Sequence, residues 1–239
     1  MEQNKQRIVV KVGTSTLTHN SGALDLWSME HLVRTLADLQ GMGHEVILVS
    51  SGAIAVGTAK LGLSERPKEL RMKQAAAAVG QCRMMHIYDK FFSEYNRSMA
   101  QILLTGDDVE DPERAEHLSN TFSALLEMGV IPVVNENDSV SSAEIETGRH
   151  KVLGDNDTLS AIVAELCRAD LLVLLSDIDG LYDADPKTHP EAKLLHQVTE
   201  LTPEILEMAG GAGSWRGTGG MATKLSAARI AMAAGCDMV

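Results

Sequence analysis

The chain has 239 residues, with 33 acidic against 21 basic side chains and a formal net charge of −12. This length can bury a sizeable core, in one large or two small domains. The excess of acids argues against binding to nucleic acids or anionic membrane surfaces, because both need basic patches. Three widely spaced cysteines form neither a metal-ligand pattern nor a disulfide framework, which favours a reducing compartment. The first residues do not resemble a signal peptide and no apolar run is long enough to span a bilayer, so we expect a cytoplasmic protein.

Short, continuously apolar runs alternate with helical patterns along the chain. The runs are "RIVVKV", "EVILVS", "MAQILLT", "VIPVV" and "DLLVLLSD". Continuous rather than alternating hydrophobicity is typical of strands buried on both faces, as in a parallel sheet. The pattern therefore predicts a three-layer α/β/α sandwich with a mainly parallel central sheet. A last apolar stretch, "GCDMV", predicts one more strand at the point where the chain stops.

Apolar residues at helical spacing predict the helices between these strands. The first helix has Ser28 as its expected N-cap and ends at Gly41 and Gly43. The other helical regions are predicted at 67–95, 112–128, 157–168 and 220–235.

Polar residues follow four of the apolar runs, where ligands bind in open α/β sheets. These residues are Gly13 to Ser15, Ser50 to Ala53, Asn135 to Asp138, and Ser176 with Asp177, Asp179 and Gly180. Small and hydroxyl residues favour anion binding at helix N-termini, and the polar acceptors suit an amino acid or a nucleotide. Any one of these stretches alone is better explained as a turn. Four together favour a binding site.

Lys11 lies inside the first apolar run. A lysine in a buried strand is costly unless it is paired or faces a ligand. The alternative is an edge strand whose lysine reaches water. Gly13, two residues later, would let a ligand approach the backbone, which favours the functional interpretation.

The stretch "GGAGSWRGTGGMATK" is a glycine-rich loop that leads into a helix and ends at Lys224. Such a helix start offers backbone N–H groups and a positive dipole end to a phosphate. The alternative is a surface loop before an ordinary helix. The chain lacks both GxxxxGK[ST] and a GxGxxG after its first strand, which argues against a P-loop ATPase and a dinucleotide oxidoreductase.

Three polar residues, Asp155, Asn156 and Asp157, open the helix in "GDNDTLSAIVAELC". Asn and Asp are favoured N-caps, which explains one of the three. A carboxylate here is also a candidate to hold two lysines in place.

Together these stretches resemble the amino-acid kinase family, and within it the members that phosphorylate the γ-carboxylate of L-glutamate. The resemblance lies in "VVKVGTSTLT", "VSSGAIAVG", "KQAAAAVGQ", "ILLTGDDVEDPER", "PVVNENDSV", "GDNDTLSA", "LLSDIDGLYDADP" and "GTGGMATKLSAARIAMAAG". It implies that Lys11 and Lys224 contact the transferring phosphoryl group and that Asp157 organises both lysines. It also implies a glutamate site and an ATP site. The glutamate site would comprise Ser51, Asp138 and Asn156; the ATP site would comprise Lys11, Ser176, Asp177, Thr218, Gly219, Gly220, Met221, Ala222, Thr223 and Lys224.

The implied reaction uses ATP, with Mg²⁺ carried on its phosphates rather than in a protein metal site, and it is the first step of proline biosynthesis. The resemblance also implies a homodimer or homotetramer, feedback inhibition by proline, and a glutamyl phosphate reductase as partner. Alternatives are a family kinase acting on N-acetylglutamate, aspartate or UMP, or a non-catalytic amino-acid or nucleotide sensor.

We expect residues 1–239 to form a single kinase domain, truncated at its C-terminus and without the PUA domain that many members carry. Residues 146–153 resemble a lengthened connection that would reshape the substrate entrance.

Overall fold

The computed structural model describes residues 5–141, 153, 155–208 and 220–239. The strands among these residues form one parallel sheet in the order β3-β4-β2-β1-β5-β6. The strands are β1 (Arg7–Val12), β2 (Glu45–Val49), β3 (Met99–Leu104), β4 (Ile131–Glu136), β5 (Leu171–Leu175) and β6 (Asp237–Met238). All five apolar runs are confirmed as strands, and the predicted terminal strand is the short edge strand β6.

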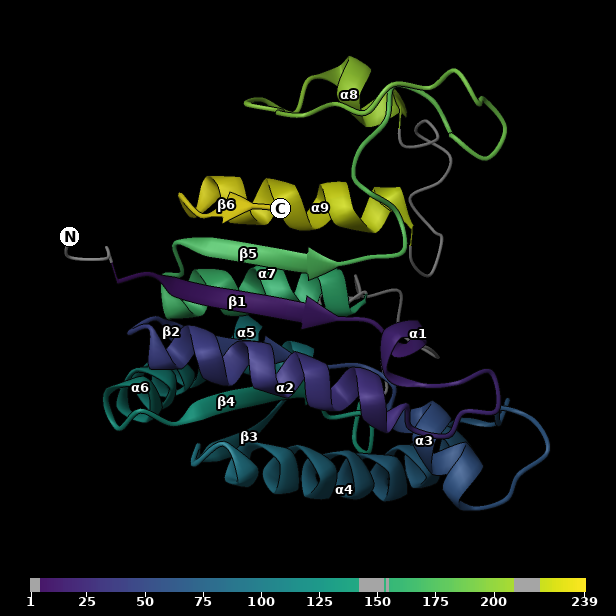
Figure 1. The fold of residues 1–239 in the computed structure, drawn as a ribbon, viewed down its shortest axis with the longest axis vertical. Helices are drawn as coiled ribbons and strands as arrows, with labels where there is room; N and C mark the ends of the chain where they lie inside the picture. Colours follow the sequence, from purple (N-terminus) through teal and green to yellow (C-terminus); the bar gives the residue numbers. More distant parts are fainter. Residues whose placement is uncertain (1–4, 142–152, 154, 209–219) are drawn as a thin grey trace.

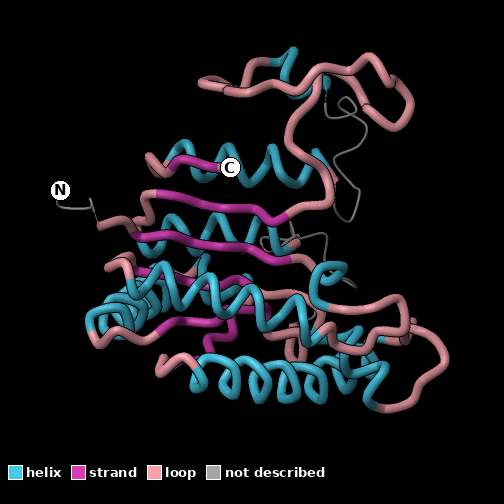
Figure 2. The backbone as a smooth tube through the Cα atoms, in the orientation of Figure 1, coloured by secondary structure: helices cyan, strands magenta, loops and turns pink. Residues whose placement is uncertain are grey.

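Helices cover both faces of this sheet, which confirms the predicted three layers (Figure 1). Helices α2 and α4 pack on one face, and α6, α7 and α9 pack on the other. The helices are α1 (Thr14–Leu17), α2 (Leu26–Gly41), α3 (Ala53–Lys60), α4 (Leu70–Glu94), α5 (Gly106–Glu110), α6 (Pro112–Glu127), α7 (Asn156–Cys167), α8 (Pro203–Met208) and α9 (Met221–Ala233). Between β5 and α8 the chain is mostly loop and lies beyond the β6 edge of the sheet (Figure 2).

The two faces of the sheet are built by strict alternation along each strand. In β1, Ile8, Val10 and Val12 belong to the core under α2 and α4, whereas Val9 belongs to the core under α7 and α9. Lys11 follows the same alternation and therefore faces α7 and α9. Because β1 lies between β2 and β5, the edge-strand interpretation of Lys11 is wrong.

The N-terminus of α2 differs from the prediction. Asp25, not Ser28, is the N-cap: its Oδ1 accepts hydrogen bonds from the backbone N–H groups of Trp27 and Ser28, both at 3.1 Å. The Ser28 hydroxyl donates to the other carboxylate oxygen of Asp25 at 2.9 Å. The Asp25 carboxylate accepts from two N–H groups that have no partner inside the helix. The helix therefore begins about one turn earlier than it would with Ser28 as the N-cap.

Among the described residues, no helix is both long enough and apolar enough to cross a membrane.

Helices α3 and α4 approach so closely that their contact excludes even a methyl group. A Cβ atom built on Gly80 would lie 1.8 Å from the carbonyl oxygen of Ala53, and one built on Gly57 would lie 1.7 Å from that of Ala76. The obstacles are backbone atoms, which cannot rotate away as a side chain does. This contact fixes the start of α3, which follows the polar end of β2, against the middle of α4.

We therefore predict that Gly80→Ala lowers the free energy of unfolding by about 3 kcal/mol or more, because the two helices must separate. Urea denaturation followed by circular dichroism measures the change. Gly41→Ala is the matched control, since the nearest atom to its new Cβ is the mobile end of Arg97, at 3.0 Å. Equal stability of the two variants would contradict the conclusion that the α3–α4 contact has no room for a methyl group.

Candidate active site

The polar stretches predicted from the sequence all lie at the carboxyl ends of the strands. Because the strands are parallel, their carboxyl ends all lie on the same side, where the arrowheads of β1 and β5 point in Figure 1. Helices α7 and α9 also begin there. The residues after β1, β2 and β4 are thus brought near the first turns of two helices.

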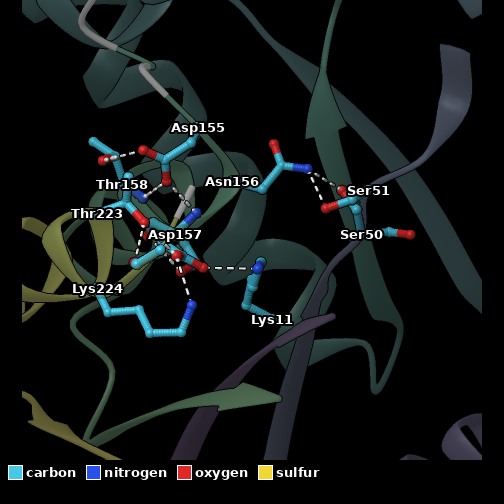
Figure 3. Close-up of polar contacts among 11 residues, drawn as sticks. Lys11, Ser50, Ser51, Asp155, Asn156, Asp157, Thr158, Thr223 and Lys224 are labelled. Atoms are coloured by element: carbon cyan, nitrogen blue, oxygen red, sulfur yellow. Dashed lines mark hydrogen bonds and ion pairs between the residues drawn. The ribbon is translucent and has the colours of Figure 1, made fainter. Parts of the chain in front are cut away.

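Lys11, Asp157 and Lys224 form the centre of this edge (Figure 3). Lys11 Nζ lies 2.7 Å from Oδ1 of Asp157, and Lys224 Nζ lies 3.3 Å from Oδ2. Thr223 adds a hydrogen bond from its hydroxyl to Oδ2 at 2.8 Å. The side chains are largely buried, with 12% of Lys11, 5% of Asp157 and 19% of Lys224 exposed. One carboxylate therefore holds two ammonium groups at the end of the sheet.

Local structure explains how residues so distant in sequence meet. Asp155 caps α7 by accepting from the backbone N–H groups of Asp157 and Thr158, at 2.7 and 3.0 Å, which places Asp157 in the first turn. Gly220 precedes α9 with φ of 113°, a conformation that favours glycine, and Lys224 follows within the first turns. Asp155 is therefore the one of the three polar residues that caps α7, and Asp157 is left for a different contact.

The charges of these three side chains favour the binding of an anion. Burial raises the pKa of Asp157, but the hydrogen bond to Lys11 and the charges of Lys11 and Lys224 outweigh it, so the pKa lies below its ordinary value. Two lysines against one ionised aspartate leave a net positive charge, in a chain whose overall charge is −12. The N-termini of α7 and α9 add positive dipole ends. The arrangement suits phosphate oxygens.

A second group of contacts joins α7 to the end of β2. The side-chain amide of Asn156 donates to the backbone oxygen of Ser50 at 3.0 Å and to the hydroxyl of Ser51 (Figure 3). On the other face, the Ser50 hydroxyl lies 2.9 Å from the hydroxyl of buried Tyr88 in α4. The end of β2 is therefore held from both sides of the sheet. Ser51 and Asn156, both predicted to bind substrate, are in direct contact.

A third group lies on the α4 side, at the end of β4. Asn135 is buried and donates to Gln81 of α4 at 2.9 Å. Beside this pair is a cavity of about 380 Å³ between α4, the edge strand β3 and the residues after β4. Half-buried Asp138 lines this cavity, as does Ala53 at the start of α3. The cavity therefore adjoins the Ser51 loop and can hold a small ligand.

The remaining predicted residues are placed as follows. Ser176 and Asp177 are exposed after β5, and within the described part of the chain neither forms a hydrogen bond or ion pair with the lysine centre. Met221 and Ala222 form the first turn of α9. Thr218 and Gly219 lie outside the described residues, as does the connection at 146–153 that was predicted to be lengthened, apart from buried Leu153.

Sequence reasoning missed Gln81 and Tyr88, which lie on one stripe of α4 at a spacing of seven residues. Gln74, seven residues earlier, donates to the backbone oxygen of Ser141 at 3.4 Å. A polar residue every two turns on an otherwise apolar helix face was the available signal. The Thr223 hydroxyl bond to Asp157 was missed as well, although Thr223 itself was a predicted site residue.

Comparison with known proteins identifies the class. The model of the amino acid kinase family matches residues 6–239, and the chain belongs to this family.

Its relatives are more specific. The chain is 56% identical over 237 residues to the glutamate 5-kinase of Clostridium perfringens strain 13, covering 99% of this chain and 87% of that protein. It is 55% identical to the glutamate 5-kinase of Clostridium acetobutylicum, covering 99% and 86%. Among solved structures, the carbamate kinase of Giardia lamblia bound to AMP-PNP superposes with a TM-score of 0.64 at 15% identity, covering 100% of this chain and 93% of that one. At that identity the structural likeness supports the fold alone.

We predict that Asp157→Asn destabilises the fold at neutral pH by about 2 kcal/mol or more, because two largely buried lysines lose their counter-ion. The folded-state pKa of Asp157 is lowered, so its stabilisation is complete above the ordinary carboxyl pKa of about 3.9 and is lost as the pH falls below it. The stability gap between the wild type and the variant should therefore hold above about pH 4 and narrow at lower pH. Urea titrations from about pH 7 down to about pH 2 measure it.

Asp111→Asn is the control, because Asp111 caps α6 and asparagine is an equally good N-cap. This variant removes the same charge without freeing a lysine. A gap for Asp157→Asn that stays constant across the pH range would show that the two ion pairs do not stabilise the fold.

Proposed function

We propose that this chain transfers the γ-phosphoryl group of ATP to the γ-carboxylate of L-glutamate, the glutamate 5-kinase reaction. An oxygen of the γ-carboxylate attacks the γ-phosphorus, and the bond from that phosphorus to the oxygen of the departing ADP breaks. The products are ADP and γ-glutamyl phosphate. The observation that carries the proposal is the Lys11–Asp157–Lys224 centre, in a chain that matches glutamate 5-kinases over nearly its whole length.

The chemistry needs charge neutralisation and alignment rather than proton transfer. A glutamate side chain has an ordinary pKa of about 4.3, so the acceptor is already ionised near neutral pH and needs no general base. The difficulty lies in bringing an anionic acceptor to an anionic phosphate in line with the leaving group. Lys11 and Lys224 each pair with one oxygen of the Asp157 carboxylate. They would stabilise the negative charge on the transferring phosphoryl group from two directions.

Asp157 would act through the lysines. Its two oxygens are engaged by Lys11 on one side and by Lys224 and Thr223 on the other. We therefore assign it a positioning role, and we assign phosphate contact to the two lysines. Gly220, Met221 and Ala222, with Thr218 and Gly219 before them, would supply backbone N–H groups to ATP, and Ser176 and Asp177 would line the nucleotide site.

The acceptor would bind on the opposite side of this centre. Ser51 and Asn156 contact each other next to Asp157, and Asp138 lines the adjoining cavity. Asp138 supplies a carboxylate for the ammonium of an amino acid. A free amine on the acceptor would favour glutamate over N-acetylglutamate or a nucleotide.

Mg²⁺ would enter with ATP. Among the described residues there is no group of three or more acidic, histidine or cysteine side chains able to hold a metal ion. Phosphate oxygens and water are the usual ligands of Mg²⁺ in such reactions, and they suit a site whose own groups are lysines and N–H donors.

Finer aspects rest on the resemblance alone. We propose a homodimer or homotetramer, inhibition by proline as the end product of the route, and transfer of the labile acyl phosphate to a glutamyl phosphate reductase.

The decisive test traps the product. The protein is incubated with ATP, Mg²⁺ and hydroxylamine, and L-glutamate, N-acetylglutamate and aspartate are offered separately, while hydroxamate and ADP are measured. Hydroxamate with L-glutamate alone is the expected result. Hydroxamate with a different acceptor, or ATP binding without turnover, would refute the proposal in favour of another family kinase or of a sensor.

We predict that Lys224→Met and Lys11→Met each lower kcat by about 10²–10³-fold, because each removes one of the charges that stabilise the transferring phosphoryl group. Steady-state ADP release measures kcat. Lys60→Met, at the exposed end of α3, is the control and should turn over normally. Near-normal turnover in either lysine variant would remove that lysine from the mechanism.

We also predict that Asp138→Ala raises the KM for glutamate about tenfold or more, with a much smaller change in the KM for ATP, since it removes the proposed partner of the substrate ammonium. Initial rates with each substrate varied in turn measure both constants. Equal losses for the two substrates would argue against this assignment.

A further inference from the structure

Gln81, a residue that lines the cavity beside α4, carries a hydrogen-bond donor without an acceptor. Gln81 is only 8% exposed and lines this cavity. Its Nε2 is buried and has no hydrogen-bond partner among the residues that the structure describes. Leaving such a donor unsatisfied costs about 1–3 kcal/mol, so its retention calls for an explanation.

The orientation of the Gln81 amide is set by a relay that starts at the backbone. The N–H of Glu136 donates to Oδ1 of Asn135 at 2.9 Å, so the NH₂ group of Asn135 must point the other way. That group donates to Oε1 of Gln81, again at 2.9 Å. This contact fixes the orientation of the Gln81 amide, so its NH₂ group points away from Asn135.

The cavity pairs this donor with a carboxylate. Asp138 lines the same cavity as Gln81. A carboxamide NH₂ complements a carboxylate of the ligand, and the Asp138 carboxylate complements an ammonium group. These are the two groups on the α-carbon of a free amino acid. The volume of about 380 Å³ falls within the range of small-molecule sites.

The position of the cavity fits an extended acceptor. Ala53 lines it, and Ser51, two residues earlier, contacts Asn156, the neighbour of Asp157. An amino acid whose α-carbon lies in the cavity would thus extend its side chain past Ser51 toward the two lysines.

We propose that Gln81 Nε2 donates a hydrogen bond to the α-carboxylate of the acceptor and so selects a free α-carboxylate. This inference rests on the proposed function and assigns the acceptor site one more residue. Gln81 contacts no reacting atom in this scheme, so it is a binding and specificity residue. A bound water would satisfy the same donor, but it would give no preference for an α-carboxylate.

The test compares L-glutamate with its α-amide, which keeps the ammonium and the γ-carboxylate. The variants are Gln81→Glu, which replaces the donor with an acceptor of the same shape, and Gln81→Met, which removes it without adding charge. The control is Gln197→Glu, the same chemical change at an exposed position between β5 and α8, away from this cavity. The readout is the ratio of kcat/KM for the two acceptors, together with the KM for ATP and the thermal midpoint.

We expect the preference for L-glutamate over the α-amide to fall about tenfold in Gln81→Met and further in Gln81→Glu. It should stay within about twofold of wild type in Gln197→Glu, and the KM for ATP should change little in all three variants. An unchanged preference in both Gln81 variants, with L-glutamate still phosphorylated, would overturn the role of Gln81 and leave the proposed function standing. If the wild type phosphorylates neither compound, the proposed function fails, and this inference fails with it.

Discussion

The arrangement of side chains at the carboxyl ends of the strands depends on the carboxylate of Asp157. Two lysines from opposite ends of the chain would repel each other if brought together alone, and each would seek water. A single carboxylate, buried at the start of α7, fixes both within 3.3 Å of its oxygens. It thereby links β1, α7 and α9 at the point where the sheet ends. The resulting local positive charge is present before any ligand arrives and would reduce the reorganisation needed for the proposed phosphoryl transfer.

The same edge is braced from the other face of the sheet by α4. Strand alternation turns Ser50 and Asn135 toward α4, just beyond the last apolar residues of β2 and β4. Tyr88 and Gln81, two turns apart, meet them there. Polar side chains at the strand ends would lack hydrogen-bond partners under an apolar helix. The face of α4 is therefore polar where it covers the polar ends of β2 and β4. Asn156 then connects the two faces by binding the backbone of Ser50.

The fold could be predicted from the sequence because buried parallel strands are continuously apolar and short, and each such run proved to be a strand. Lys11 was ambiguous for a physical reason: its cost in a central strand is removed only by Asp157, and pairing across the chain leaves no local signal. The cap of α2 was misplaced because Asp25 and Ser28 are both good N-caps, and only the geometry selects the one with two N–H groups in reach. The regular spacing of Gln81 on α4 marks it as a polar position on an apolar face, but its partner Asn135 lies in a distant strand, so the sequence does not show what it contacts.

These contacts separate two tasks that the reaction imposes. The α7 and α9 side concentrates positive charge, which any phosphoryl acceptor in this family of reactions would need. In the proposed site, the α4 side carries an amide donor and a carboxylate, which suit the α-carboxylate and the ammonium of an amino acid. Because a buried donor left unpaired penalises the wrong ligand more than an apolar wall would, discrimination belongs on that side. The boundary between them is the Ser51–Asn156 contact. Substitutions in α4 should therefore alter which acceptor is used, whereas substitutions at the lysine centre should alter the rate for every acceptor.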